Sequence, residues 1–350
     1  MLNELLRQSF NRPLYSELVS ASRRRGGSFE TKQRREGECK LFCIWLQSEN
    51  LQYRNSAGVK VRDVRRYFAE LIELELKPGT LQNRASYLRA VLPRFVISNQ
   101  DLGIGPRSRQ GTHLPCPEEV YERALQSLRD DWAKALLMLQ RHLGLRILEA
   151  VRSGVSLRSW KKQLIEGDTI RVVFGTKGGR PRLTQVCDRG EALEAVIFSL
   201  EVLRTTRRKK LVPSRSQKSA KSLYYSRLGK VGLKGELSSH SLRYRFACEL
   251  LEKYAREGFT EKEAFSLVSQ SLGHGDGRGK YIRSVYCRWM PPYLEIQRRQ
   301  REEKFRRALR KKHESHSVNQ WAGMCRLASN AQAFRGARKV GISLVDQRLK

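Results

Sequence analysis

The sequence is poor in acidic residues and lacks long apolar runs and paired metal-ligand motifs. Its 350 residues include 35 Asp and Glu against 69 Lys and Arg. No apolar run approaches the roughly 20 residues that a membrane-spanning helix needs, and residues 1–12 lack the continuous apolar core of a secretory signal. The seven cysteines are scattered, without a C-x-x-C pair or a His-Glu-x-x-His motif. These absences predict a reduced, intracellular chain with no membrane span and no metal centre.

The excess of positive charge is the strongest compositional feature. A net charge of +34 indicates a polyanionic partner, either nucleic acid or an anionic membrane surface. The basic residues are spread over segments that look folded and are not confined to one amphipathic helix, which disfavours the membrane. We therefore expect a nucleic-acid partner.

Hydrophobic periodicity and composition divide the chain into five parts. Apolar residues at helical spacing predict a helical bundle early in the chain, and a stretch rich in Gly, Pro and polar residues then reads as a linker. A second domain follows, and a strongly basic segment ends the chain. The expected parts are an N-terminal basic arm at 1–27, the bundle at 28–97, the linker at 98–117, the second domain at 118–292 and a basic tail at 293–350.

Within the second domain the apolar period changes from helical to alternating and back. Residues 169–174 and 183–186 read as strands, and the glycine-rich segment 175–182 joins them as a hairpin. We expect a serine-rich basic loop at 207–221 before helix resumes. The predicted fold class is mainly α with a small antiparallel β-sheet (α+β).

A histidine and an arginine mark the start of one helix in this domain. His240 and Arg243 follow Ser238 and Ser239, either of which can cap a helix. Their spacing of three residues puts both side chains on one face of the first turn. A proton-handling group beside a forked cation suits phosphate chemistry.

Other candidate residues are weaker when each is taken alone. Lys177 lies at the tip of the hairpin between glycines, where a solvated turn lysine is the simpler interpretation. Arg146 and Glu149 begin a helix and could be an ordinary exposed pair. The glycine-rich segment 273–280 does not satisfy the Walker pattern, so a flexible loop that begins near His274 describes it better.

The order of these residues resembles the tyrosine recombinase (phage integrase) family, over about residues 28–290. The resemblance rests on the following series: Arg146 within Leu143-Gly144-Leu145-Arg146-Ile147-Leu148-Glu149, Lys177 in a β-turn, His240-x-x-Arg243, Leu272-Gly273-His274, and a tyrosine soon afterwards. It implies a helical core-binding domain at 28–97 and a catalytic domain at 118–292.

The resemblance also implies a chemistry, in which a tyrosine attacks a DNA phosphate, forms a 3′-phosphotyrosyl link and frees a 5′-hydroxyl without metal, ATP or another cofactor. Arg146 and Arg243 would hold the phosphate, and Lys177 would protonate the leaving oxygen. His240 would assist proton transfer, and His274 would contact a phosphate oxygen. Glu149 would orient the neighbouring basic groups.

The nucleophile is the point at which the sequence departs from the family. Tyr286 follows His274 at more than the usual distance, and Tyr281 follows it at slightly less. Tyr286 is the preferred nucleophile because 283–286 resembles the family's nucleophile segment and 275–280 looks like an insertion. Tyr281 stays open as the alternative.

The implied activity is integration or excision of a mobile element. The partners would be double-stranded DNA, three further copies of the chain in a homotetramer on two DNA sites, and accessory bending or directionality factors, in a cytoplasmic, nucleoid-associated setting of bacterial or phage origin. Alternatives are a type IB-like topoisomerase, a hairpin resolvase or a non-catalytic DNA-binding relative. The basic tail would either dock on a neighbouring protomer or bind DNA non-specifically.

Overall fold

The computed structural model describes residues 11–107, 114–206, 210–304 and 306. These residues are mainly helical, with one two-stranded antiparallel sheet, as the sequence predicts. The chain forms two compact units that divide between Gln110 and Gly111. The first ten residues, part of the linker and most of the basic tail lie outside the described residues.

The first unit is a bundle of amphipathic helices around an aromatic core. Its main helices are α2 (Arg12–Arg24), α3 (Phe29–Ser48), α4 (Val61–Glu73) and α5 (Pro78–Arg89). The hydroxyl of Ser28 accepts a hydrogen bond from the Thr31 N–H and so caps α3. Phe42 and Phe68 are fully buried in the core.

The edges of this unit differ from the expected domain limits. Residues 12–24, predicted to belong to an arm, form α2, whose Leu14 and Leu18 are completely buried in the first core. Leu102 and Ile104, predicted to lie in the linker, are also part of this core. Scattered apolar residues in a polar stretch give little periodicity, so only their tertiary contacts reveal that they are core positions.

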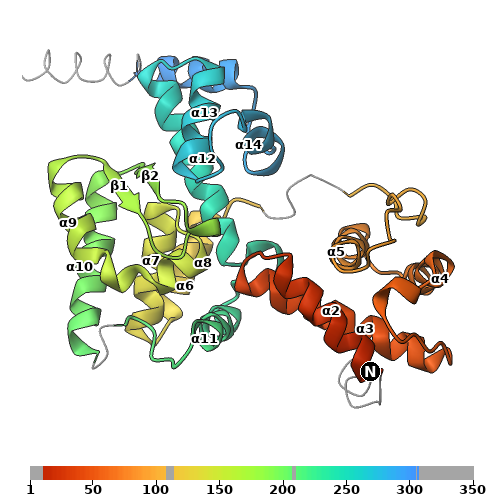
Figure 1. Cartoon of the computed structure of the whole chain (residues 1–350). Helices are drawn as coiled ribbons and strands as arrows, with labels where there is room; N and C mark the ends of the chain where they lie inside the picture. The colour runs from red at the N-terminus through yellow and green to blue at the C-terminus, as the bar shows by residue number, and fades with distance from the viewer. Residues whose placement is uncertain (1–10, 108–113, 207–209, 305, 307–350) are drawn as a thin grey trace, which may run out of the picture. The chain divides into compact units, whose positions relative to one another are not determined.

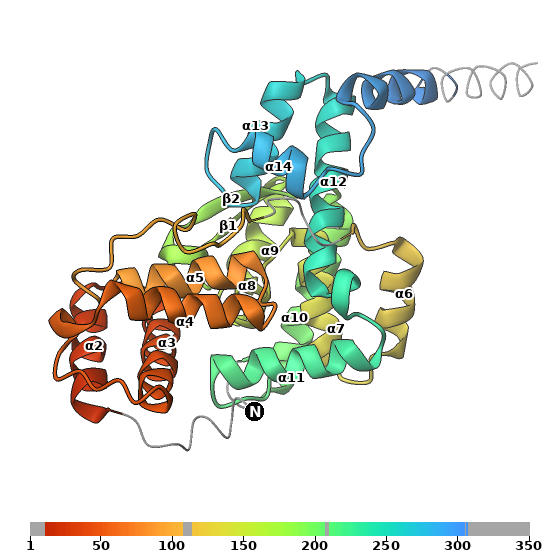
Figure 2. The same ribbon diagram turned by 90° about the vertical axis from the view of Figure 1, so that its right-hand side faces the viewer.

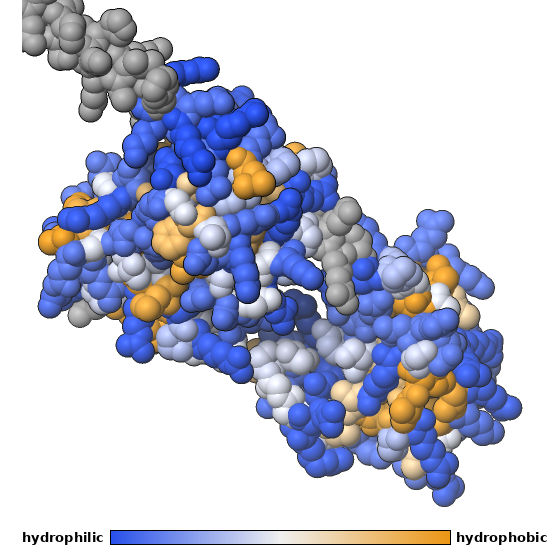
Figure 3. Space-filling view, turned by 90° about the horizontal axis from the view of Figure 1, so that it is seen from above, coloured by the Kyte–Doolittle hydropathy of each residue, from blue (hydrophilic) through white to orange (hydrophobic). Residues whose placement is uncertain are grey.

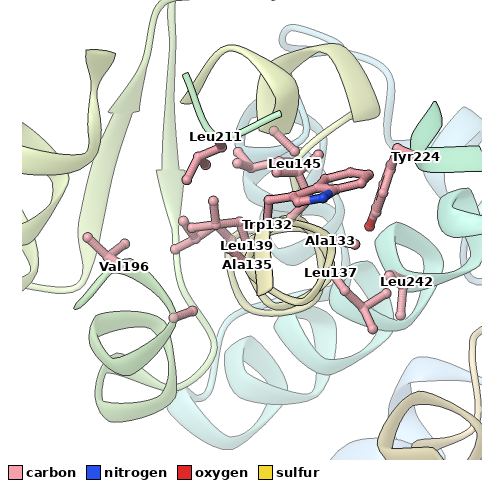
Figure 4. Packing of buried hydrophobic residues seen from close by; sticks show 14 of the residues in the cluster. Trp132, Ala133, Ala135, Leu137, Leu139, Leu145, Val196, Leu211, Tyr224 and Leu242 are labelled. Atoms are coloured by element: carbon pink, nitrogen blue, oxygen red, sulfur yellow. The ribbon is translucent and has the colours of Figure 1, made fainter. Parts of the chain in front are cut away.

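The second unit contains a larger set of helices and the sheet (Figure 1). Its helices are α6 (Glu118–Ser127), α7 (Asp131–Leu143), α8 (Ile147–Val151), α9 (Leu157–Glu166), α10 (Arg189–Thr205), α11 (Gln217–Lys230), α12 (Ser239–Glu257), α13 (Glu261–Ser271) and α14 (Gly279–Val285). Helix α7 packs against α10 and α12. Figure 4 shows the core around α7, where the Trp132 ring meets Tyr224 edge to face.

The hairpin pairs β1 (Thr169–Val172) with β2 (Arg182–Gln185). Residues 173–174 were expected to continue the first strand, but they lie beyond its end. Ile170 and Val172 point into the core, and the register sets Val172 opposite Arg182. The hairpin therefore turns an arginine toward the interior.

Two further segments carry more structure than their composition suggests. Helix α11 begins within the expected serine-rich loop, and its Ala220, Tyr224 and Leu228 form a buried stripe at spacing of four residues. Residues 293–304 are helical, and Tyr293 and Ile296 are buried in a core cluster of the second unit. Part of the predicted basic tail thus packs against the unit that precedes it.

None of the helices in the described residues combines the length and the apolar character that a bilayer crossing requires.

Gly144 is the residue whose substitution should disturb this arrangement most directly. It ends α7 with φ of 58°, and a Cβ there would clash with the ring of Phe246 on α12. We expect Gly144→Ala to lower the free energy of unfolding by about 2–5 kcal/mol, from left-handed backbone strain and overpacking. Chemical denaturation measures this change.

Gly232→Ala is the matched control, because Gly232 has φ of 86° but open space around its Cα. It should cost only the backbone strain of about 1–2 kcal/mol. Equal losses in the two variants would show that the contact between α7 and α12 is not what Gly144 protects.

Candidate active site

Arg243 lies at the centre of the site, on the first turns of α12. The helix begins at Ser239 with Ser238 at its N-cap, so His240 and Arg243 share one face. Arg243 is completely buried, and its guanidinium donates to the carbonyls of Gly144 and Leu272. Its Nε is buried without a hydrogen-bond acceptor among the described residues.

Arg146 reaches the same carbonyl from another element. It stands at the N-cap of α8 and donates from Nη2 to the Leu272 oxygen at 2.9 Å. Its Nη1 lies 2.9 Å from Oε1 of Glu149, and its backbone N–H donates to Oε2 of the same carboxylate at 2.8 Å. Arg146 and Glu149 are therefore not an exposed helix-surface pair but part of a buried network.

Arg182 completes this network and is not among the residues predicted from the sequence. Its Nη2 lies 2.7 Å from Oε2 of Glu149, and its Nη1 donates to Thr184 Oγ1 and to the Ser271 carbonyl. Arg182 is 8% exposed, whereas its neighbour Leu183 is 63% exposed. Hydrophobicity alone would place these two residues the other way round. The observed strand register explains the burial, because it sets Arg182 opposite the buried Val172.

The charges in this network set the protonation states of its members. Burial alone would raise the pKa of Glu149, but Arg182 and Arg243 outweigh burial and lower it to about 2. Burial lowers the pKa of Arg182 to about 10, although Glu149 opposes the shift. At neutral pH one carboxylate thus stands among three guanidiniums, and the site keeps an excess of positive charge.

His274 and Tyr286 meet beside these arginines. His274 Nε2 lies 3.1 Å from the phenolic oxygen of Tyr286, and the Arg243 guanidinium lies 6.0 Å from the centre of the tyrosine ring. The rings of His240 and Tyr244 also flank Tyr286, at 6.0 and 4.6 Å between centroids. Tyr286 is only 3% exposed. Both Figures 1 and 2 show that α13 and α14, which bracket His274 and lead into Tyr286, lie beside α12.

The protonation state of His274 follows from its neighbours. Burial and the charges of Arg243 and Arg146, with smaller effects of Arg278 and Lys177, lower its pKa to about 3. The imidazole is therefore neutral at neutral pH. Proton transfer is predicted for His240, whose ring flanks Tyr286; the His274 ring is also within reach, since its Nε2 lies 3.1 Å from the phenolic oxygen.

Tyr281, the alternative nucleophile, lies on α14 and is partly exposed. Its ring centroid is 5.1 Å from that of His274 and 6.2 Å from that of Tyr286. Burial and the neighbouring Tyr286 raise its pKa. Tyr281 thus borders the site, whereas Tyr286 lies inside it.

Lys177 enters the site from the hairpin. It begins the turn Lys177–Gly179 and is exposed. A cavity of about 770 Å³ has walls formed by Lys177, Arg146, Arg182 and His274. The structure therefore brings together all of the predicted site residues, with Lys177 at the open side.

Replacement of Glu149 tests this electrostatic network. Glu149→Gln leaves the buried Arg182 without its counter-charge, so we expect the free energy of unfolding at pH 7 to fall by about 3–5 kcal/mol. Because the pKa of Glu149 is lowered from 4.5 to about 2, the carboxylate stabilises the fold fully above pH 4.5, and that contribution is lost as the pH falls toward 2.

Denaturation at several pH values measures this effect, and the difference between wild type and variant should shrink between pH 4.5 and 2. The control is Glu166→Gln, which removes a carboxylate from an exposed pair with Lys162 at 3.8 Å and should cost less than about 1 kcal/mol. A pH-independent difference would contradict the assigned ion pair.

Comparison with known proteins places the chain in a family. Residues 103–249 match a family model described as "Integrase", and residues 12–95 match one described as "Phage integrase, N-terminal". The first match includes Arg146, Lys177, His240 and Arg243, and it ends before His274 and Tyr286.

Two individual proteins are also similar. The tyrosine recombinase XerD of Shewanella oneidensis is 28% identical over 260 residues, which cover 67% of this chain and 79% of that protein. Among solved structures, the Tn1549 transposon integrase in complex with a circular intermediate DNA has a TM-score of 0.50 and 14% identity, covering 84% of this chain and 99% of that one. The second similarity concerns the fold alone. The chain belongs to the tyrosine recombinase/integrase family, whose reaction is site-specific DNA recombination.

Proposed function

We propose that this protein cleaves and rejoins DNA strands through a covalent link between Tyr286 and a 3′-phosphate, and that it integrates or excises a mobile genetic element. The observation that carries this proposal is the position of the Tyr286 hydroxyl, 3.1 Å from a neutral imidazole and beside the buried Arg243 guanidinium. A tyrosine in this setting has a proton acceptor and a cationic site for phosphate within reach.

The attack begins with loss of the phenolic proton. Tyrosine has an ordinary pKa of about 10, so a base must take the proton as the oxygen bonds to phosphorus. His274 Nε2 lies 3.1 Å from that oxygen and would accept the proton. Two cations, Arg243 and Arg146, lower the pKa of His274. A bound phosphate would neutralise the same two cations. Substrate binding would therefore make His274 a stronger base.

The developing charge on phosphorus requires fixed cations. Arg146 and Arg243 would donate to the non-bridging oxygens, and both are already held by carbonyl acceptors, so little reorganisation is needed. As the bond from phosphorus to the 5′ oxygen breaks, Lys177 would protonate that oxygen. The phosphotyrosyl link conserves the energy of the diester, so a 5′-hydroxyl can reverse the reaction without ATP.

The remaining features support DNA as the substrate. The net charge is +34, and hydrophilic residues cover most of the face seen in Figure 3. In the proposed organisation the region 28–97, extended by α2, is the core-binding domain, and 118–292 is the catalytic domain. Contacts of Lys and Arg to phosphate would supply most of the affinity, which should fall steeply with salt. Strand exchange would take place in a homotetramer on two DNA sites.

The nucleophile assignment can be tested with a nicked suicide substrate that carries the recombination site. Wild type should form a covalent adduct, visible as a shifted band on a denaturing gel. Tyr286→Phe should form none, because only the hydroxyl is lost and the ring packing remains.

Tyr281→Phe is the matched control and should still form the adduct. If Tyr281→Phe abolishes the adduct while Tyr286→Phe keeps it, Tyr281 is the nucleophile. If wild type forms no adduct on its proper site, the chain binds DNA without cleaving it.

The role of Lys177 can be tested by changing the leaving group. Lys177→Ala should slow cleavage of ordinary DNA by about 100-fold or more, the usual contribution of a general acid. A substrate with sulfur at the bridging 5′ position should be cleaved by this variant as fast as by wild type, because a thiolate leaves without protonation. An equal defect on both substrates would show that Lys177 acts in another way.

A further inference from the structure

Arg182 joins three parts of the site that are far apart in the sequence. From β2 it contacts Glu149 at the start of α8, 33 positions away, and the Ser271 carbonyl at the end of α13, 89 positions away. Its remaining donor contact is with Thr184, and the residue is 8% exposed. The guanidinium donors of Arg182 are therefore used within the protein, although the residue forms part of the cavity wall.

Arg182 also lies against the backbone that leads to His274. A Cβ on Gly273 would come within 2.5 Å of Cδ of Arg182, and Gly273 has φ of 67°. The backbone N–H of His274 is held by the Ser269 carbonyl at 2.9 Å. The position of Arg182 thus limits where residues 271–274 can lie.

Arg182 is also connected to Arg146 electrostatically, through the carboxylate that both contact. The Glu149 carboxylate has two arginine partners, Arg182 at 2.7 Å and Arg146 at 2.9 Å. While Arg182 neutralises Glu149, the charge of Arg146 stays available to another anion. Without Arg182, the carboxylate would be compensated mainly by Arg146, whose pull on a phosphate would weaken.

We propose that Arg182 is a positioning residue for the strand-cleavage reaction, which acts through Glu149 on Arg146 and through the 271–274 backbone on His274. This inference rests on the proposed function. In this role Arg182 would contact neither DNA nor the reacting atoms, because its donors are used by Glu149, Thr184 and Ser271. Its loss should therefore lower the rate of cleavage and leave the affinity for DNA nearly unchanged.

The test compares single-turnover cleavage at saturating DNA with the dissociation constant for the same DNA. Arg182→Met keeps the length of the side chain and removes its charge and donors. We expect the cleavage rate to fall by about 100-fold, the usual effect of misplacing catalytic groups by about 1 Å. The dissociation constant should stay within about threefold, because the phosphate contacts that set affinity remain.

A double variant separates charge compensation from simple packing. In Arg182→Met with Glu149→Gln the carboxylate is gone and no longer compensates the charge of Arg146, so cleavage should be faster than in Arg182→Met alone. Arg171→Met is the control on the same hairpin; Arg171 is exposed, and its loss should leave the rate unchanged.

Each outcome decides between the two proposals. Wild-type cleavage rates in Arg182→Met, or equal losses of rate and affinity, would overturn the positioning role while the adduct at Tyr286 stands. Absence of an adduct in wild type would instead overturn the proposed function. If Arg182→Met does not fold, Arg182→Lys replaces it: slow cleavage at unchanged affinity supports the role, and a wild-type rate rejects it.

Discussion

The buried carboxylate of Glu149 is the interaction on which the site depends. Three arginines, Arg146, Arg182 and Arg243, converge on one small region and would repel one another without compensation. Glu149 pairs directly with two of them and lies close enough to the third for its charge to be felt. Desolvation of charged groups is costly unless they are paired and hydrogen-bonded, so the rest of the site must supply the remaining acceptors.

Helix C-termini supply those acceptors. The last carbonyls of a helix have no partner within the helix and carry partial negative charge. Gly144 ends α7, and Ser271 and Leu272 end α13. Their carbonyls accept from the guanidiniums of Arg243, Arg182 and Arg146. The helix ends are thereby satisfied, and the arginines are fixed before any phosphate arrives.

This arrangement also explains the state of His274 and Tyr286. The excess of positive charge keeps His274 neutral. Tyr286 follows the end of α14, and its hydroxyl lies within hydrogen-bond distance of His274. A site with an excess of positive charge beside a phenol is suited to an anionic substrate that brings its own compensating charge. The same excess of positive charge lowers the stability of the fold when no substrate is bound. Removal of one charged partner in the site is therefore expected to change both the free energy of unfolding and the cleavage rate.

The sequence by itself determined the helical bundles, the hairpin, the basic character and the order of Arg146, Lys177, His240, Arg243, His274 and Tyr286, because periodicity, turn residues and short motifs are local. Only the tertiary structure decided that α2 belongs to the first core, that the hydroxyl of Tyr286 lies within hydrogen-bond distance of His274, and that Arg182 is buried. Arg146 and Leu272 are separated by 126 positions, and contacts between residues so far apart produce no periodic pattern in the sequence. Arg182 could not be predicted for a further reason. In its strand the charged Arg182 is buried and the apolar Leu183 is exposed, which is the opposite of the usual pattern. The buried charge is tolerated because Glu149 and the Ser271 carbonyl at the end of α13 bind it.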